Sequence, residues 1–365
     1  MMPIDIARVG VVSALGIGFD AYAAALRAGM RARVQSVDSA GDSFPPCGAI
    51  TLGDFDAAAY LGRKGLSTLD RITQFSIAAC KQIADDRGIS APERQDRCGL
   101  VLGSAAGGLR STSDFIRTTY TSALPYQVSP LQFPNAIMNS AASQCAIRFD
   151  MRGVNATICA GELSGLAALG YASRMLRAGH ADNLVAGSAE EFCGFGAWSH
   201  HAAGATDDLA LGEGSAVFEL QASRTGRHAP ARLKAIRLRR AGRDATDVDA
   251  ATLGGHIRRM LEETATATGA VTWWSAHRGV ARPDHALHRE ALRLAGLSPD
   301  QMHPVAHDLH EQIGFTGAAS TSLQLAAAIA TAPSGMGVLT AIGAHGDIAC
   351  ALVEIPAIAE RSVGQ

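Results

Sequence analysis

The stretch Val154–Ala172 (VNATICAGELSGLAALGYA) has the pattern that leads to an enzyme nucleophile: an apolar strand, a turn of small residues and the start of a helix. The turn contains Cys159, Glu162 and Ser164, and one of them would lie at its tip, at a helix N-terminus. The helix dipole and the free N–H groups of such a position favour a thiolate or an oxyanion. The chemistry of this turn therefore depends on which residue occupies the tip.

Other motifs with possible chemistry do not match their patterns. GSAAGG at 103–108 lacks both the GxGxxG and the GK[ST] spacing of phosphate loops, and it predicts a tight turn. GELSG at 161–165 has serine fourth, whereas the hydrolase elbow GxSxG needs it third. His303, His307 and His310 have helical spacing without HExxH or a similar motif, which predicts a solvated polar helix face. We expect neither a metal nor a cofactor.

The composition describes a globular protein with a large core. Of 365 residues, 47% are hydrophobic and 18% are charged, and the net charge of −2 gives no basic face for nucleic acid. No run of about 20 apolar residues predicts a membrane span, and the N-terminus does not have the pattern of a signal peptide. The seven cysteines are scattered without CxxC spacing, which predicts reduced thiols and a cytoplasmic location.

Strand and helix patterns alternate along the chain, which predicts an α/β protein with a mostly parallel sheet covered by helices. In the first part the expected strands are 7–12, 98–103, 155–159 and 183–187, and the expected helices are 20–28, 70–87 and 166–178. A polar, basic segment follows Ala222, and the order then repeats with strands at 233–238, 272–276, 335–342 and 348–355 and helices near 252–266, 285–295 and 320–330. We expect two similar halves, residues 1–225 and 226–365.

A series of ordered motifs covers essentially the whole chain. They are ARVGVVSALGIGFDAYAAALRAG near the start, FPNAIMNSAASQCAIRF at 133–149, RGVNATICAGELSGLAALGYASRMLRAGHADNLVAGSAEE at 152–191, GFGAWS at 194–199, LGEGSAVFEL at 211–220, SAHRG at 275–279 and GFTGAAS at 314–320. Together they resemble the β-ketoacyl synthases of the thiolase superfamily. The resemblance implies a thiolase-like fold of two βαβαβαββ halves stacked as five layers, α-β-α-β-α, in an obligate dimer. It also implies a cysteine that accepts an acyl chain from an acyl carrier protein, and two histidines that help to decarboxylate a malonyl unit.

Counting from both sides places Glu162 where the family has its nucleophilic cysteine. In the family an Asn precedes that cysteine by seven positions, and from Asn155 this gives Glu162. A Gly in the following helix lies eight positions after it, and from Gly170 this again gives Glu162. A nucleophilic Cys159 would need compensating gaps, and a strand cysteine between apolar neighbours predicts a buried side chain. A carboxylate at the tip cannot form a thioester.

The two histidine positions of the family are also altered. His277 in SAHRG matches the first histidine without the threonines that normally surround it, and Gly314 stands in the place of the second. The lysine of the family is missing, with Leu309 nearest to its position. Three losses at separate points of the chain predict that condensation has been abandoned.

The family contains a class with this profile, the chain-length factors or ketosynthase β subunits of type II polyketide synthases. Each pairs with an active ketosynthase and limits the length of the chain that is built on the carrier protein. In aromatic systems Gln is typical at the nucleophile position, so Glu162 and the short segment 200–209 favour factors of highly reducing polyene systems such as aryl polyenes. GAHGD at 343–347 replaces the gating loop of the family without its Phe.

The same resemblance implies where a tunnel and an interface would lie, in the stretch 107–143 and along 155–161. The bulky candidates for closing the tunnel are Phe115, Tyr120, Tyr126, Phe133 and Met138, with ordinary core packing as the other explanation. Two further hypotheses stay open: an autonomous thiolase-fold decarboxylase or acyltransferase that uses Glu162 or Cys159 with His277, and a scaffold that stabilises its partner without setting chain length.

Overall fold

Ten strands of the large sheet form two groups of five. The computed structural model describes residues 2–36, 44–45, 47–53, 55–84, 92–203, 209–223, 228–243, 247–277, 279, 285–305 and 308–357. The first group, in spatial order, is β6 (Asn155–Ile158), β5 (Cys98–Gly103), β7 (Asn183–Glu190), β9 (Gly214–Ala222) and β1 (Ile4–Ser13). The second is β12 (His303–Pro304), β11 (Val271–His277), β13 (Gly335–Ile342), β14 (Asp347–Ile355) and β10 (Ala231–Arg240).

Both groups have the same topology. When the strands of each group are numbered along the chain, the spatial order is 3-2-4-5-1 in both. The three strands at one end are parallel, and the fourth neighbour, β9 or β14, runs antiparallel to both of its partners. The prediction of a mostly parallel sheet is therefore wrong, because the last strands of each half return antiparallel and the two halves also join antiparallel. This repetition confirms the predicted pair of similar halves. The predicted boundary at 225 lies within residues 224–227, outside the described residues, and the division stays a prediction.

The two groups join through a short antiparallel contact between β1 and β10, in which Ile4–Ile6 pair with residues 231–233. The hydrogen bonding is therefore continuous across both groups, while β2 (Gly16–Ile17) only extends the turn after β1. A separate small sheet contains β3 (Gln35–Ser36), β4 (Gly48–Ile50) and β8 (Leu211–Gly212).

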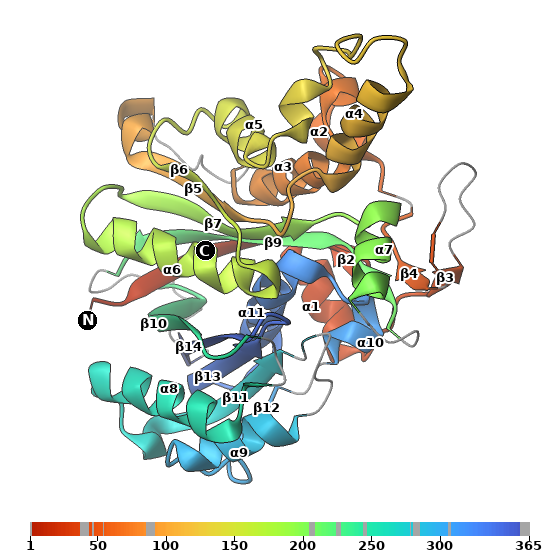
Figure 1. Ribbon diagram of the computed structural model, residues 1–365. Coiled ribbons are helices and arrows are strands. Elements are labelled where there is room, and N and C mark those ends of the chain that lie inside the picture. Colours follow the sequence, from red (N-terminus) through yellow and green to blue (C-terminus); the bar gives the residue numbers. More distant parts are fainter. Residues whose placement is uncertain are drawn as a thin grey trace.

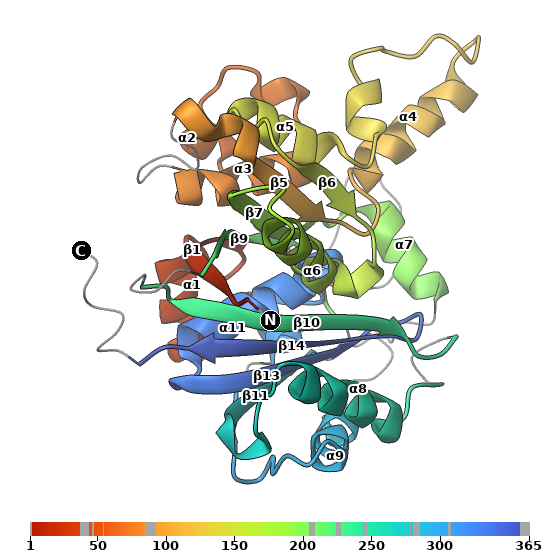
Figure 2. The same ribbon diagram turned by 90° about the vertical axis from the view of Figure 1, so that its left-hand side faces the viewer.

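Helices cover both outer faces and fill the space between the sheets, which gives the five predicted layers (Figure 1). The helices α3 (Arg71–Ala84) and α5 (Ser140–Arg148) cover the first sheet, and α2 (Ala57–Leu61) packs on α3. The helix α4 (Leu109–Thr121) lies farther out, in contact with α7 (Gly194–Ala202). The helices α8 (Ala250–Glu263) and α9 (Ala286–Leu294) cover the second sheet, as the turned view also shows (Figure 2). Between the sheets lie α1 (Phe19–Arg27), α6 (Ser164–Arg177) and α11 (Ser320–Thr331).

The composition of the central helices explains their position. In α11 every residue from Ser320 to Ala330 is buried, and most are Ala, Leu or Ile. A helix that is apolar on all sides needs protein contacts on all sides, which the space between two sheets provides. The amphipathic helices α8 and α9 bury only one face, which suits an outer layer. In the described part of the chain, none of the helices combines the length and the apolar character that crossing a membrane requires.

The sequence-based element boundaries differ from the structure by one to three residues at the ends of most helices and strands. The expected strands 98–103 and 335–342 match β5 and β13 at both ends, because buried apolar runs between turn residues mark them clearly. The predicted helix 70–87 is described as Arg71–Ala84, and residues 85–87 lie outside the described residues. The strand expected at 155–159 ends one residue earlier, at Ile158, which places Cys159 in the turn.

Candidate functional site

The turn after β6 places Glu162 at the start of α6. Gly161 has φ +52°, in the left-handed region that favours glycine, and begins the short 3-10 helix η4 (Gly161–Leu163). Ser164 Oγ accepts a hydrogen bond from the Ala160 N–H at 3.0 Å and donates one to the Gly161 carbonyl at 2.6 Å. These contacts fix the turn, so the geometry of a nucleophile elbow is kept with a carboxylate at its tip.

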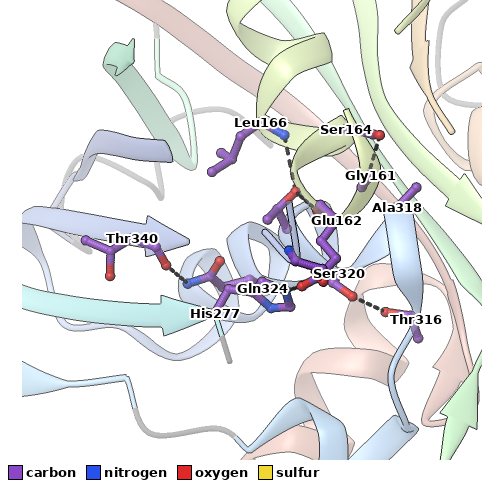
Figure 3. A network of polar contacts seen from close by, with 12 residues as sticks. Gly161, Glu162, Ser164, Leu166, His277, Thr316, Ala318, Ser320, Gln324 and Thr340 are labelled. Atoms are coloured by element: carbon purple, nitrogen blue, oxygen red, sulfur yellow. Dashed lines mark hydrogen bonds and ion pairs between the residues drawn. The ribbon is translucent and has the colours of Figure 1, made fainter. Parts of the chain in front are cut away.

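Both carboxylate oxygens of Glu162 have partners from the second half of the chain. Oε2 lies 3.0 Å from Nε2 of His277 at the end of β11, and Oε1 accepts a hydrogen bond from the Ala344 N–H at 3.3 Å. The main-chain carbonyl of Glu162 accepts one from Thr321 Oγ1, at the start of α11, at 3.2 Å. Figure 3 shows Glu162 extending towards His277. One residue is therefore connected to β11, to the turn between β13 and β14, and to α11.

The Glu162–His277 pair is buried, with 7% of Glu162 and 5% of His277 exposed. The contact between Nε2 of His277 and Oε2 of Glu162 is a hydrogen bond for which either the imidazole or the carboxyl group can supply the hydrogen. A buried carboxylate is costly unless it is paired and hydrogen-bonded, and here the imidazole and a backbone N–H meet that need. Because Glu162 and His277 bond to each other, their hydrogen-bonding groups are not available to a substrate.

Gly279 packs tightly against this pair. A Cβ atom added to Gly279 would lie 3.0 Å from Oε2 of Glu162 and 2.5 Å from the carbonyl of Ile342. A larger residue at 279 would therefore displace the carboxylate or the end of β13. The threonines that the family has around His277 are absent here, and the backbone at Gly279 lies close to Glu162 instead.

His310 lies in this site, contrary to the prediction of a solvated helix face. His303 is in β12 and His310 is in α10 (Leu309–Ile313), so the two do not share a helix; His307 lies outside the described residues. The ring of His310 stacks edge-on to that of His277, with centroids 5.4 Å apart. Spacing along the chain could not reveal this contact, because it depends on how α10 packs against β11.

A further histidine, His200, lies near His277 and His310 and contacts Phe315. The ring of His200, in α7 (Gly194–Ala202), lies 5.1 Å from that of Phe315, and the ring of His310 lies 5.4 Å from it on another side. Burial lowers the pKa of the His200 imidazole, and the charge of the nearby Glu162 opposes this shift. The site thus contains three imidazoles and the Glu162 carboxylate, of which the sequence motifs indicated His277 and Glu162.

Gly314 supplies no imidazole at the second histidine position. It has φ +75° at the end of α10, and an added Cβ would lie 3.0 Å from backbone atoms of residues 210–212. In the described part of the chain, no three His, Cys, Asp or Glu side chains are placed to share a metal ion.

Cys159 is exposed, and the prediction that it is a buried strand residue is wrong. It follows the last residue of β6 in the turn, where the chain leaves the sheet. Its Sγ donates a hydrogen bond to the carbonyl of Ala105 at 3.0 Å. The described contacts of this thiol therefore join two turns and involve no histidine.

The five tunnel candidates lie on α4 and in the segment between α4 and α5. Tyr120 is 85% exposed and Tyr126 is 75% exposed, and Phe133 and Met138 are also exposed. Phe115 is half-buried, with its ring 5.8 Å from that of Phe133. Core packing within this chain therefore does not account for four of the five side chains. Figure 2 shows α4 and the following segment extending away from the layered body.

The chain is similar to known proteins over its whole length. The family model described as "Beta-ketoacyl synthase, N-terminal domain" matches residues 8–209, more than half of the chain. The chain is 28% identical over 365 residues to the tetracenomycin polyketide synthase ketoacyl synthase beta subunit of Streptomyces glaucescens, covering 97% of this chain and 85% of that protein. It is 32% identical over 189 residues to 3-oxoacyl-[acyl-carrier-protein] synthase 2 of Coxiella burnetii, covering 51% of this chain and 45% of that protein.

The fold is shared with a solved structure. A chain in the structure of the ishigamide ketosynthase/chain length factor has 31% sequence identity and a TM-score of 0.83, with 97% of this chain and 100% of that chain covered. The alignments to the 3-oxoacyl synthases span less than half of those proteins. The matched family model and this full-length structural match place the chain in the β-ketoacyl synthase family.

Proposed function

We propose that this chain is a non-condensing chain-length-factor subunit, which pairs with an active ketosynthase and shapes the tunnel for a growing polyketide or polyene chain. The observation that carries the proposal is the carboxylate of Glu162 at the nucleophile position, with both oxygens engaged by His277 and Ala344. A carboxylate forms no thioester with an acyl chain, and here it also occupies the imidazole that would polarise one.

The similarity to a ketoacyl synthase beta subunit over 97% of the chain and to the ishigamide ketosynthase/chain length factor supports the same role. The partners we propose are an active ketosynthase subunit and, through the complex, an acyl carrier protein that carries the chain. We place the complex in the cytoplasm, in keeping with seven cysteines that are scattered without CxxC spacing.

Co-expression with and without a ketosynthase tests the role. We expect product only when both chains are present, and no transfer of radiolabelled acyl or malonyl groups from the carrier protein to this chain alone. Glu162→Cys should remain unlabelled, because Gly314 supplies no imidazole at the second histidine position. An isolated homodimer that accepts label would instead establish the autonomous decarboxylase or acyltransferase.

The exposed aromatic side chains carry the second part of the proposal, the setting of chain length. Tyr120→Ala, Phe133→Ala and Met138→Ala should each lengthen the product, while Phe115→Ala should act through the ring of Phe133. The products are compared by mass spectrometry for complexes of equal stoichiometry. Unchanged product length across the series, with the complex intact, would reduce the chain to a scaffold.

A further inference from the structure

A series of buried polar contacts crosses the second half of the molecule. Gln324, in the middle of the apolar helix α11, is 3% exposed. Its Nε2 donates to Ser275 Oγ at 3.1 Å and to the Thr340 carbonyl at 3.5 Å. Thr340 Oγ1 lies 2.8 Å from Nδ1 of His288, which belongs to α9 in the outer layer. The contacts therefore run from an outer helix, through two strands, to the central helix (Figure 3 shows Gln324 reaching Thr340).

The other end of the Gln324 amide is not satisfied by these contacts. Its Oε1 is buried and has no hydrogen-bond partner among the described residues. An unpaired buried acceptor costs about 1–3 kcal/mol, and native proteins meet that need with a protein group or an ordered water. A buried amide with an unpaired oxygen thus indicates a partner at Oε1.

A small cavity lies at the same place. Its volume is about 20 Å³, and Gln324 lines it together with Ser275, His277, Asp308 and His310. A cavity needs about 10–15 Å³ to admit one water molecule, and that water needs two to four polar partners. A volume of this size fits one water molecule, and the polar side chains of the lining can serve as its partners.

We propose that this cavity binds one water molecule, which donates to Gln324 Oε1 and contacts the imidazole of His277, and that Gln324 is thereby a positioning residue for His277. The water continues the polar contacts from His288 to the Glu162–His277 pair. It holds the imidazole in the orientation in which Nε2 faces Glu162. This inference concerns the interior of the site and holds whether or not the chain sets product length.

The first test is a high-resolution crystal structure of the complex with its ketosynthase, in which we expect one ordered water within hydrogen-bond distance of Gln324 Oε1. The second is NMR of the same complex with ¹⁵N-labelled histidine, the His277 signals being assigned by their loss in His277→Gln. In the unaltered complex, His277 should give the shifts of a single tautomer with the hydrogen on Nε2.

Gln324→Met keeps the length of the side chain and removes the acceptor. We expect the water to be lost and the His277 shifts to move towards a mixture of tautomers. Leu323→Met, on the same buried helix, is the matched control and should leave both unchanged. If Gln324→Met fails to fold, Ser275→Ala tests the same cavity by removing a hydroxyl from its wall, with a change of the His277 shifts in the same direction expected. A dry cavity in the crystal structure, or His277 shifts unchanged in the folded variants, would overturn the proposal.

Discussion

Glu162 has its two carboxylate oxygens engaged by His277 and Ala344, and its carbonyl by Thr321. A nucleophile in the same place needs a free, reachable atom and an imidazole available to its substrate. The residue that replaces the nucleophile therefore does more than remove a thiol, because it ties the first half of the chain to three segments of the second. Substitution of Glu162 should therefore lower the free energy of unfolding.

Glu162→Ala should lower the free energy of unfolding by about 1–3 kcal/mol, because it leaves the buried imidazole of His277 without its partner. Glu162→Gln keeps an acceptor and a similar shape, so its effect should be smaller. Thermal unfolding of the two variants in the complex measures the difference. Equal stability of Glu162→Ala and the unaltered chain would show that the pair contributes nothing to the fold.

Glu191 gives a pH dependence whose sign can be worked out. Burial raises the pKa of Glu191 to about 7, although its carboxylate accepts hydrogen bonds from the N–H groups of Arg110 and Ile72. The folded chain therefore keeps this proton to a higher pH than the unfolded chain, whose carboxyl ionises near 4.5. As the pH rises from about 4.5 to 7, the free energy of unfolding should fall by up to about 1.4 kcal/mol per pH unit from this group.

Glu191→Gln should flatten that fall, as measured by denaturant unfolding at a series of pH values. Desolvation also raises the pKa of the adjacent Glu190, to about 8, so a residual slope should persist in the variant up to that pH. A slope identical to that of the unaltered chain would mean that Glu191 is ionised in the folded protein.

Among the helices and strands, features that depend on local sequence pattern could be predicted, and contacts that depend on the packing of distant segments could not. The strands β5 and β13 were predictable to the residue, because buried apolar runs are bounded by turn residues. Glu162 at the tip was predictable by counting from fixed neighbours. The contact of His310 with His277 was not, because α10 and β11 are distant in sequence. The exposure of Cys159 was missed because β6 ends one residue early.

The segment that carries Phe133 and Met138 is held over two glycines at the start of α4. An added Cβ at Gly107 would lie 2.8 Å from the Cα of Met138. One at Gly108 would first meet the carboxylate of Asp70 and would also lie 2.8 Å from the Asn135 carbonyl. Asn135 Nδ2 also donates to the Thr68 carbonyl at 2.7 Å, which fixes the segment on its other side. Because Gly107 and Gly108 have no side chains, the segment that carries Phe133 and Met138 can lie directly against them.

Gly107→Ala should therefore shift the segment 133–138 and change product length without altering an exposed side chain, because the added Cβ meets only the backbone of Met138. The cost in stability should be about 1–3 kcal/mol, as for other overpacked sites. The control is Gly255→Ala on the exposed face of α8, where an added Cβ meets nothing within 4 Å and helix propensity should increase stability slightly. Products from the two complexes are compared by mass spectrometry, and identical lengths would contradict this role of the segment.

For the molecule as a whole, the first sheet ends at β6 within the described residues. The carbonyl of Val154 accepts a hydrogen bond from Leu100 in β5 at 2.8 Å, and that of Ile158 accepts one from Ser104, just after β5, at 3.0 Å. Alternation along the strand therefore directs the backbone groups of Thr157 to the open side. An open edge is a template for pairing with another chain. The exposed Cys159 follows directly, and the exposed side chains of the segment 120–138 extend the surface that a partner could cover.

Thr157→Pro should therefore weaken assembly with the ketosynthase at least tenfold while the chain itself stays folded, because proline at a sheet edge removes one outward N–H and spares the pairing with β5. Ala156→Pro is the matched control: its N–H faces β5, so the substitution should disrupt the sheet and the fold. Both variants are co-expressed with a tagged ketosynthase, and the recovered chains are compared by co-purification and circular dichroism. Normal assembly of Thr157→Pro would mean that the partner contacts side chains of this surface and does not extend the sheet.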